Sequence, residues 1–186
     1  MSRIGKKPIG IPAKVTVAVA DGSVKIDGPN GSLSAPVRSN ISVEVDDGAK
    51  TVTVSLDEAS MGDRFSRAMW GTTRATIQNM ITGVTAGFQK IVEVNGVGYG
   101  AEVQGNKLKV TAGYANPHMK VIPDGVKVDV EKGSVTKVVV KGPDKQKVGQ
   151  FAAEVRSVRT TNPYTGKGIS YSGERIRRKQ GKKFGA

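Results

Sequence analysis

The sequence of 186 residues has a formal net charge of +13, 37% hydrophobic and 5% aromatic residues, and no cysteine. Without cysteine, disulfide bonds, thiolate zinc sites and cysteine nucleophiles are excluded. No stretch approaches the roughly 18 apolar residues of a membrane span, and no apolar run follows the basic start of the chain, so we expect neither a membrane segment nor a secretory signal. The length fits one large domain or two small ones with thin cores.

The positive charge is concentrated at the two ends of the sequence. Residues 1–14 contain four basic residues and no acid, and residues 164–186 contain seven basic residues against Glu174. The 149 residues between them hold 18 basic and 15 acidic residues and are nearly neutral. Such ends either bind a polyanion or form solvated, disordered tails, and charge alone leaves both interpretations open.

The first half of the sequence begins with strand patterns. Valine, isoleucine and leucine alternate with small or polar residues in four segments, and Asp-Gly pairs and a Gly-Pro-Asn-Gly run separate them. Period-two alternation broken by such turns predicts antiparallel hairpins with one buried face. The segments are residues 15–19, 24–26, 41–45 and 52–56.

A helix is predicted next, over about residues 60–82. Its apolar residues recur with helical spacing, whereas Arg64, Arg67 and Arg74 fall on the other side. Asp57 or Ser60 is expected to cap the start of the helix, and Gly83 to end it. A solvated face is the default interpretation of the three arginines, and RNA contact is the alternative.

The second half of the sequence repeats this order. Strand patterns at residues 91–94, 101–103, 107–110, 126–130 and 138–140 precede a predicted helix over residues 144–159, with Val148, Ala152 and Val155 on its apolar face. Residues 42–48 also match residues 127–133 in pattern. We therefore predict an α+β fold of two tandem similar domains, each a small antiparallel sheet packed against one main helix, with basic termini. The expected domains are residues 1–82 and 83–163, followed by a basic tail at residues 164–186.

No catalytic, metal or cofactor site is predicted. His118 is the one histidine, so no nucleophile–base set can be assembled around it, and a surface or hairpin position is expected. Residues 96–100 resemble a dinucleotide loop, but a strand pattern follows where that loop needs a helix. Residues 166–168 lack the glycine spacing and the Ser/Thr of a phosphate-binding loop.

The basic tail combines glycines, tyrosines and cations. Glycine lets the backbone approach phosphates, Arg and Lys neutralise them, and Tyr164 and Tyr171 can stack on bases or bond phosphate through the hydroxyl. This mixture suits an irregular RNA surface better than a DNA groove, which usually receives a preformed helix. A flexible tail with two incidental tyrosines would have the same composition.

Four separated motifs give the sequence a family resemblance. The run Asn162-Pro163-Tyr164-Thr165-Gly166-Lys167-Gly168-Ile169, followed by Tyr171 and the Arg/Lys tail, resembles the C-terminal motif of the ribosomal protein L-six family. Residues 1–9, 96–99 and 142–150 also resemble the bacterial members of that family. Thr165 departs from the usual lysine, and Asn116-Pro117-His118 from the usual Ser-His-Pro run.

The resemblance implies a structural, non-enzymatic protein of the large ribosomal subunit in the cytoplasm. It implies two duplicated α+β domains and binding to large-subunit rRNA near the stalk base and the sarcin–ricin region, beside neighbouring ribosomal proteins. It implies no cofactor, membrane or small-molecule substrate. From the resemblance and the charge pattern together, the expected RNA-binding residues are Arg3, Lys6, Lys7, Tyr164, Gly166, Lys167, Gly168, Tyr171, Arg175, Arg177, Arg178, Lys179, Lys182 and Lys183.

Two other functions are weighed against this one. A non-ribosomal RNA-binding regulator or chaperone would share the charge pattern, and only the motif resemblance separates it from a ribosomal protein. An enzyme acting on an anionic substrate would need a reactive constellation that the sequence does not offer.

Overall fold

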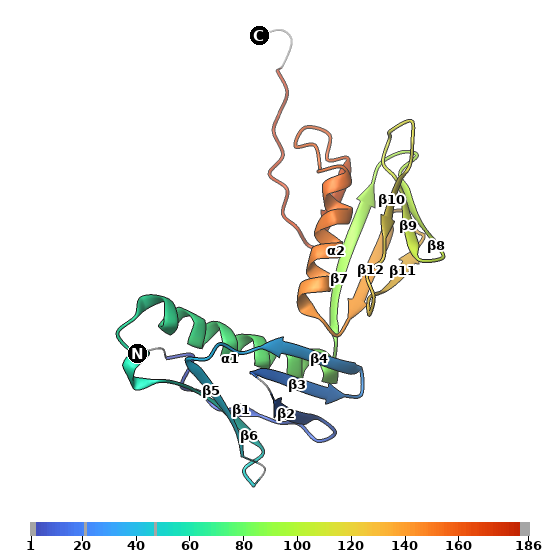
Figure 1. The fold of residues 1–186 in the computed structure, drawn as a ribbon. Coiled ribbons are helices and arrows are strands. Elements are labelled where there is room, and N and C mark those ends of the chain that lie inside the picture. The colour runs from blue at the N-terminus through green and yellow to red at the C-terminus, as the bar shows by residue number, and fades with distance from the viewer. Residues whose placement is uncertain (1–2, 21, 47, 183–186) are drawn as a thin grey trace. The chain divides into compact units, whose positions relative to one another are not determined.

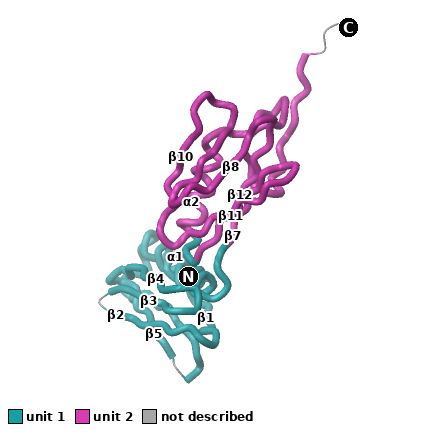
Figure 2. The backbone as a smooth tube through the Cα atoms, turned by 90° about the vertical axis from the view of Figure 1, so that its right-hand side faces the viewer, with its two compact units in different colours: residues 1–88, 143–145 teal, residues 89–142, 146–186 magenta. Residues whose placement is uncertain are grey.

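The computed structural model describes residues 3–20, 22–46 and 48–182. The chain forms two compact units, residues 1–88 with 143–145 and residues 89–142 with 146–186, which Figure 2 colours separately. Each unit combines strands with one long helix (Figure 1), so the predicted α+β class is confirmed.

The described residues of unit 1 form six strands in two three-stranded sheets. One sheet has the order β2-β3-β4 and the other β1-β6-β5, and all their pairs are antiparallel. The strands are β1 (Ile9–Gly10), β2 (Thr16–Ala20), β3 (Ser23–Gly28), β4 (Gly31–Pro36), β5 (Ile41–Asp46) and β6 (Thr51–Leu56). The predicted hairpins are thus present, but β2 is an edge strand on which Val19 stays 45% exposed.

The helix of unit 1, α1 (Arg64–Thr85), begins later than predicted. A 3-10 turn, η1 (Glu58–Ser60), comes first, and Asp63 then caps the helix by accepting bonds from the Phe65 and Ser66 backbone N–H groups at 3.2 and 2.8 Å. The predicted caps Asp57 and Ser60 are therefore wrong, because Asp57 precedes the 3-10 turn and Ser60 ends it, before α1 begins. This cap holds the pKa of the Asp63 carboxyl below its ordinary value, mainly through hydrogen bonds from the Ser66 side chain and backbone.

The end of α1 also differs from the prediction. Gly83 lies buried inside the helix, and the last turn closes at Ala86 and Gly87, whose N–H groups both donate to Thr82 O at 2.9 and 3.2 Å. Gly87 has φ +77°, the left-handed conformation that usually ends a helix and that glycine adopts without strain.

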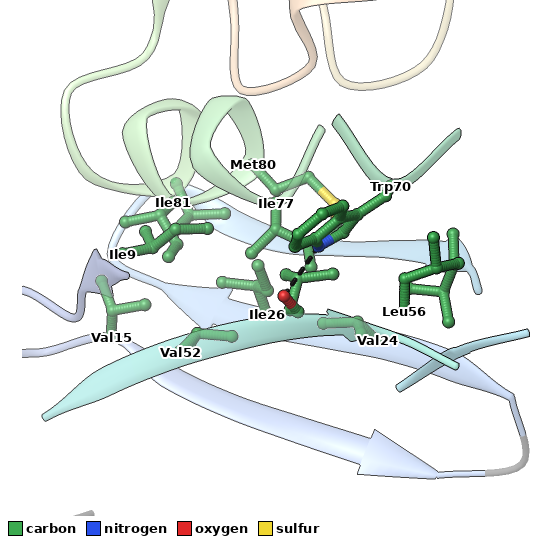
Figure 3. Close-up of a cluster of buried hydrophobic side chains, with 13 residues drawn as sticks. Ile9, Val15, Val24, Ile26, Val52, Leu56, Trp70, Ile77, Met80 and Ile81 are labelled. Atoms are coloured by element: carbon green, nitrogen blue, oxygen red, sulfur yellow. Dashed lines mark hydrogen bonds between the residues drawn. The ribbon is translucent and has the colours of Figure 1, made fainter. Parts of the chain in front are cut away.

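The core of unit 1 lies between α1 and the two sheets (Figure 3). Trp70 is its largest side chain at 6% exposed, and the indole N–H donates to Val54 O of β6 at 2.8 Å. The indole therefore contributes apolar area without leaving its polar nitrogen unpaired. Isoleucines and valines from both sheets belong to the same buried cluster, including Ile9, Val24, Ile26 and Val52.

Unit 2 is built around a four-stranded sheet and a three-stranded sheet. Their strand orders are β11-β12-β7-β13 and β10-β9-β8. The elements from residue 88 onward are β7 (Phe88–Asn95), β8 (Gly100–Gln104), β9 (Lys107–Thr111), β10 (His118–Val121), β11 (Lys127–Glu131), β12 (Thr136–Gly142), α2 (Lys145–Val158) and β13 (Gly168–Tyr171). The second predicted helix is confirmed to within one residue at each end.

The core of unit 2 joins α2 to the four-stranded sheet. Val148, Phe151, Ala152 and Val155 are the buried face of α2, as the helical spacing predicted except for Phe151, which the prediction did not name. Ile169 of β13 is also fully buried. Each fully buried valine, isoleucine or phenylalanine side chain contributes about 2 kcal/mol through its removal from water.

β13 lies within the predicted basic tail, so that tail is not one extended segment. Its residues pair antiparallel with β7, from Gly168 opposite Asn95 to Tyr171 opposite Val92. β10 was also not predicted. His118, its first residue, pairs with Val110 and is exposed, which is the hairpin position expected for it.

Candidate nucleic-acid interface

The loop that carries the family motif connects α2 to β13, and we call residues 159–167 the C-terminal loop. Its two ends are joined, because the Ile169 N–H donates to Arg159 O at 2.9 Å and the Thr161 hydroxyl donates to Ile169 O at 3.1 Å. Within it, the Asn162 N–H donates to Lys167 O at 2.9 Å. A loop closed in this way by backbone bonds to a core strand has a defined shape.

Two glycines of the motif permit that shape. Gly166 and Gly168 have φ of +71° and +139°, and both are buried. A Cβ at Gly168 would lie 2.5 Å from the Thr161 Cα atom and 2.8 Å from Thr160 O. The position of Gly168 therefore requires glycine, whereas Gly166 has a left-handed conformation that glycine adopts without strain.

The C-terminal loop exposes two of the predicted RNA-binding side chains, Tyr164 and Lys167. Tyr164 is 57% exposed, and its backbone is fixed because the N–H donates to the Asn162 side-chain oxygen at 2.8 Å. Thr165, which replaces the family's usual lysine, serves the loop itself: its hydroxyl oxygen accepts a bond from the Lys167 N–H at 3.4 Å, and its backbone carbonyl accepts one from Arg178 at 3.3 Å. The loop thus displays one aromatic ring and one cation.

Residues 172–182 return along the C-terminal loop. The Lys179 N–H donates to Pro163 O at 3.1 Å, and Arg178 reaches the Thr165 carbonyl. These contacts place two predicted cations beside the loop. Arg175, Arg177 and Lys182 are exposed on the same segment, whereas Lys183 lies outside the described residues.

An ion pair fixes the start of this segment to α2. The Arg156 guanidinium donates to both Glu174 carboxylate oxygens, at 2.6 and 3.1 Å, and the Tyr171 N–H donates to the same carboxylate at 3.0 Å. The side chains are 34% and 28% exposed. Bonds from Arg156 and then from the Tyr171 backbone hold the pKa of Glu174 below its ordinary value, and the bond to Glu174 raises the pKa of Arg156.

Tyr171 is partly covered by protein cations. Its ring centroid lies 5.4 Å from the Arg156 guanidinium carbon and 5.5 Å from the Lys90 ammonium nitrogen, and the residue is only partly exposed. The prediction that it binds RNA stays a prediction, but the structure already gives this ring cation–π partners.

The N-terminal cations belong to unit 1. Arg3, Lys6 and Lys7 are exposed, and Lys7 is held through its carbonyl, which accepts a bond from the Arg74 side chain of α1 at 3.1 Å. The structure therefore gives Arg74 a structural contact, while Arg64 is exposed. These cations and those of the C-terminal loop lie on different units.

Two arginines were missed in the sequence, Arg156 in the last turn of α2 and Arg159 at the start of the C-terminal loop. Arg159 donates to Ala112 O and Gly113 O at 2.8 and 3.3 Å, and its guanidinium lies over the rings of Tyr99 and Tyr114 at 5.4 and 5.1 Å. The position of Arg156 in the last turn of α2 is a weak signal of a functional site, since a basic residue there complements the helix dipole in any protein.

In the described ranges, no group of three or more His, Asp or Glu side chains could hold a metal ion. Neither helix in those ranges has the length and apolar character needed to cross a membrane.

Comparisons with known proteins identify the family of this chain. The family model described as ribosomal protein L6 matches twice, over residues 11–87 and 95–172, which confirms the predicted tandem duplication. Proteins named large ribosomal subunit protein uL6 are similar over nearly the full length of both chains. The one from Sphingopyxis alaskensis is 45% identical, with 98% of this chain and 99% of the relative covered. Those from Geobacter metallireducens and Syntrophus aciditrophicus are 47% and 42% identical, with 98% and 100% of each chain covered. The chain belongs to the ribosomal protein L6 family, in its bacterial form.

Proposed function

We propose that this protein is a structural component of the large ribosomal subunit in the cytoplasm and that it performs no catalysis. It binds large-subunit rRNA near the stalk base and the sarcin–ricin region and contacts neighbouring ribosomal proteins. The names of its relatives support the assignment to the large subunit. The family resemblance supports the region of rRNA.

The observation that carries the proposal is the anchored C-terminal loop with the cations beside it. Lys167 and Lys179 are exposed on backbone that the bonds to Asn162 and Pro163 hold in place. A preorganised cation loses less conformational entropy on binding than one on a disordered tail. The anchoring therefore favours a defined RNA contact over a solvated tail.

The exposed cations supply the binding energy through the phosphates. Each phosphate that Lys or Arg neutralises releases counterions, so the affinity falls as salt rises. The slope of log affinity against log salt is negative. For RNA, we expect it to become shallower by about 0.7 to 0.9 for each phosphate that is no longer neutralised. Arg175, Arg177, Lys179 and Lys182 supply cations on unit 2, and Arg3, Lys6 and Lys7 supply a second set on unit 1.

Charge removal tests the proposal directly. The combined substitution of Arg177, Lys179 and Lys182 by alanine should weaken binding to purified large-subunit rRNA and make the salt slope shallower by about 2 to 3. The backbone bond of Lys179 to Pro163 survives in this variant, because only side chains change. Filter binding across a salt series measures both quantities.

The matched control removes the same charge from strands of unit 2 that lie outside the C-terminal loop and the tail. Lys107, Lys127 and Lys137 are exposed on β9, β11 and β12, and their combined substitution by alanine should leave the affinity and the slope nearly unchanged. Equal losses in the two triple variants would mean that general charge, not the tail, binds the RNA.

Sedimentation separates the ribosomal role from a free regulator or chaperone. The tagged full-length protein should migrate with the large subunit through a high-salt wash, and free protein at the top of the gradient would refute the structural role. Crosslinking of the assembled subunit, with mapping of the attached nucleotides, then tests the stalk-base and sarcin–ricin location.

A further inference from the structure

A groove of about 470 Å³ lies in unit 2 beside the C-terminal loop. Tyr114 lines one part of it, and residues 157–164 line the rest, from the last turn of α2 to Tyr164. We call it the tyrosine groove. Neither the charge pattern nor the family motif predicted it, because Tyr114 comes from the segment between β9 and β10.

Two exposed aromatic rings line this groove. Tyr114 and Tyr164 are 48% and 57% exposed, although large aromatic side chains are normally buried. They lie 50 positions apart in the sequence, so it is the fold that brings them to one groove. An exposed aromatic pair in a concave site is suited to hold a flat ligand by stacking.

The ring of Tyr114 is held in place before any ligand arrives. The Arg159 guanidinium lies 5.1 Å from its centroid and is itself bonded to Ala112 O and Gly113 O. The His118 ring meets it edge to face, with the centroids 5.1 Å apart and the planes at 78°. This is a role for His118 that the sequence did not suggest.

The position of Tyr164 is set by its backbone. Its N–H donates to the Asn162 side chain, and the preceding carbonyl of Pro163 accepts the bond from Lys179. Lys167 and Lys179 therefore belong to the same anchored loop structure as the ring. Of the residues that line the groove in the described chain, none is acidic.

We propose that the tyrosine groove holds one unpaired nucleobase of RNA in stacking contact with both Tyr114 and Tyr164, while nearby cations bind the adjoining phosphates. This inference rests on the proposed RNA-binding function and adds a class of RNA feature, an extruded or bulged base. Stacking on an aromatic side chain changes affinity by about 5- to 100-fold for each base. The lack of acidic lining and the adjacent lysines favour RNA over a peptide of a neighbouring protein.

The test uses the full-length chain and two RNA hairpins of the same stem. One hairpin has a single bulged 2-aminopurine, and the other is fully paired. Wild-type protein should bind the bulged hairpin more tightly and quench the 2-aminopurine fluorescence. Tyr114→Ala and Tyr164→Ala should each weaken this binding by about 5- to 100-fold with an unchanged salt slope, and leave the paired hairpin nearly unaffected.

Two controls make the result specific. Tyr114→Phe and Tyr164→Phe keep the ring, so they should retain both the preference and the quenching. Lys167→Ala should weaken both hairpins alike and make the salt slope shallower. Circular dichroism of each variant should match the wild type.

Three results would overturn the inference. In the first, the wild type binds the two hairpins with equal affinity and does not quench the 2-aminopurine. In the second, the alanine variants lose equal affinity for both hairpins. In the third, these variants bind RNA normally but are incorporated poorly into the large subunit. The last result would indicate a protein occupant. Failure of the proposed function is distinct, because the wild type would then bind neither hairpin nor large-subunit rRNA.

Discussion

Replacement of Gly168 by alanine should loosen the C-terminal loop while the two helices stay folded. Gly168 has φ +139°, and its Cβ would meet Thr161 Cα at 2.5 Å and Thr160 O at 2.8 Å. Both atoms are backbone, so no side chain can turn away to make room. The main chain must shift, and the shift breaks the bond between the Thr161 hydroxyl and Ile169 O.

The magnitude follows from two costs. An L-residue in a glycine-only conformation costs about 1–3 kcal/mol, and the clash with the backbone adds to it. We expect the free energy of opening the loop to fall by about 3 kcal/mol in total. This corresponds to roughly a 100-fold loss of hydrogen-exchange protection. Affinity for large-subunit rRNA should fall as well, because Lys167 loses its fixed position.

Native-state hydrogen exchange at the Asn162 and Ile169 amides is the direct assay, since both N–H groups bond across the loop. Gly173→Ala is the matched control: its φ is +77°, but no atom lies within 4 Å of the added Cβ, so the cost should be only about 1–2 kcal/mol. Equal protection of Ile169 in wild type and Gly168→Ala, or an equal effect of the two variants, would refute the steric argument.

Two further substitutions test the anchors of each unit. Because the folded state lowers the pKa of Glu174, the Arg156 ion pair stabilises the protein at neutral pH and is lost as the pH falls through that lowered value. Glu174→Gln should lower the free energy of unfolding in urea by about 1 kcal/mol at pH 7, a value reduced for the solvent exposure of the pair. The difference from wild type should shrink in acid, and a pH-independent difference would contradict this reasoning. Trp70→Phe should destabilise unit 1 by about 1–3 kcal/mol, since Val54 O loses its buried donor, and an unchanged urea midpoint would show that the bond contributes little.

The strands and helices that the sequence predicted are those with local signals. Alternation of Ile41, Val43 and Val45 marks β5, and helical spacing marks α1, because each pattern depends on a face that the element itself creates. The ends of α1 were wrong for a related reason. Several residues before it can cap a helix, and only the path of the chain through η1 selects Asp63.

β13 shows where local reasoning stops. It pairs with β7 across more than 70 positions, from Gly168 opposite Asn95 to Tyr171 opposite Val92, and no local pattern encodes that register. Ile169 is a single buried aliphatic residue between Gly168 and Ser170, so the alternation is too short to stand out among cations. The same limit applies to the tyrosine groove.

The predicted RNA-binding residues divide into two physical roles that the sequence did not separate. Gly166 and Gly168 are buried and give the C-terminal loop its conformation, whereas Tyr164 and Lys167 are exposed and available to a ligand. The motif therefore specifies one loop geometry as well as residues for contact. Substitutions at the two glycines should act through the shape of the loop, and those at Tyr164 and Lys167 through the ligand itself.

The position of Glu174 explains how a tail can be fixed without losing its charge. It is the one acid among residues 164–186, and an ion pair with a tail cation would have neutralised part of the surface that binds RNA. Its carboxylate instead bonds Arg156 on α2 and the Tyr171 N–H, so the tail is anchored by a cation from outside it. The tail's own arginines and lysines keep their charge for phosphate. Because anchoring and RNA binding use different cations, a substitution can weaken one while the other is retained. Glu174→Gln should lower the stability of the fold and leave the salt slope of RNA binding unchanged. The triple alanine variant should make the salt slope shallower and leave the stability nearly unchanged.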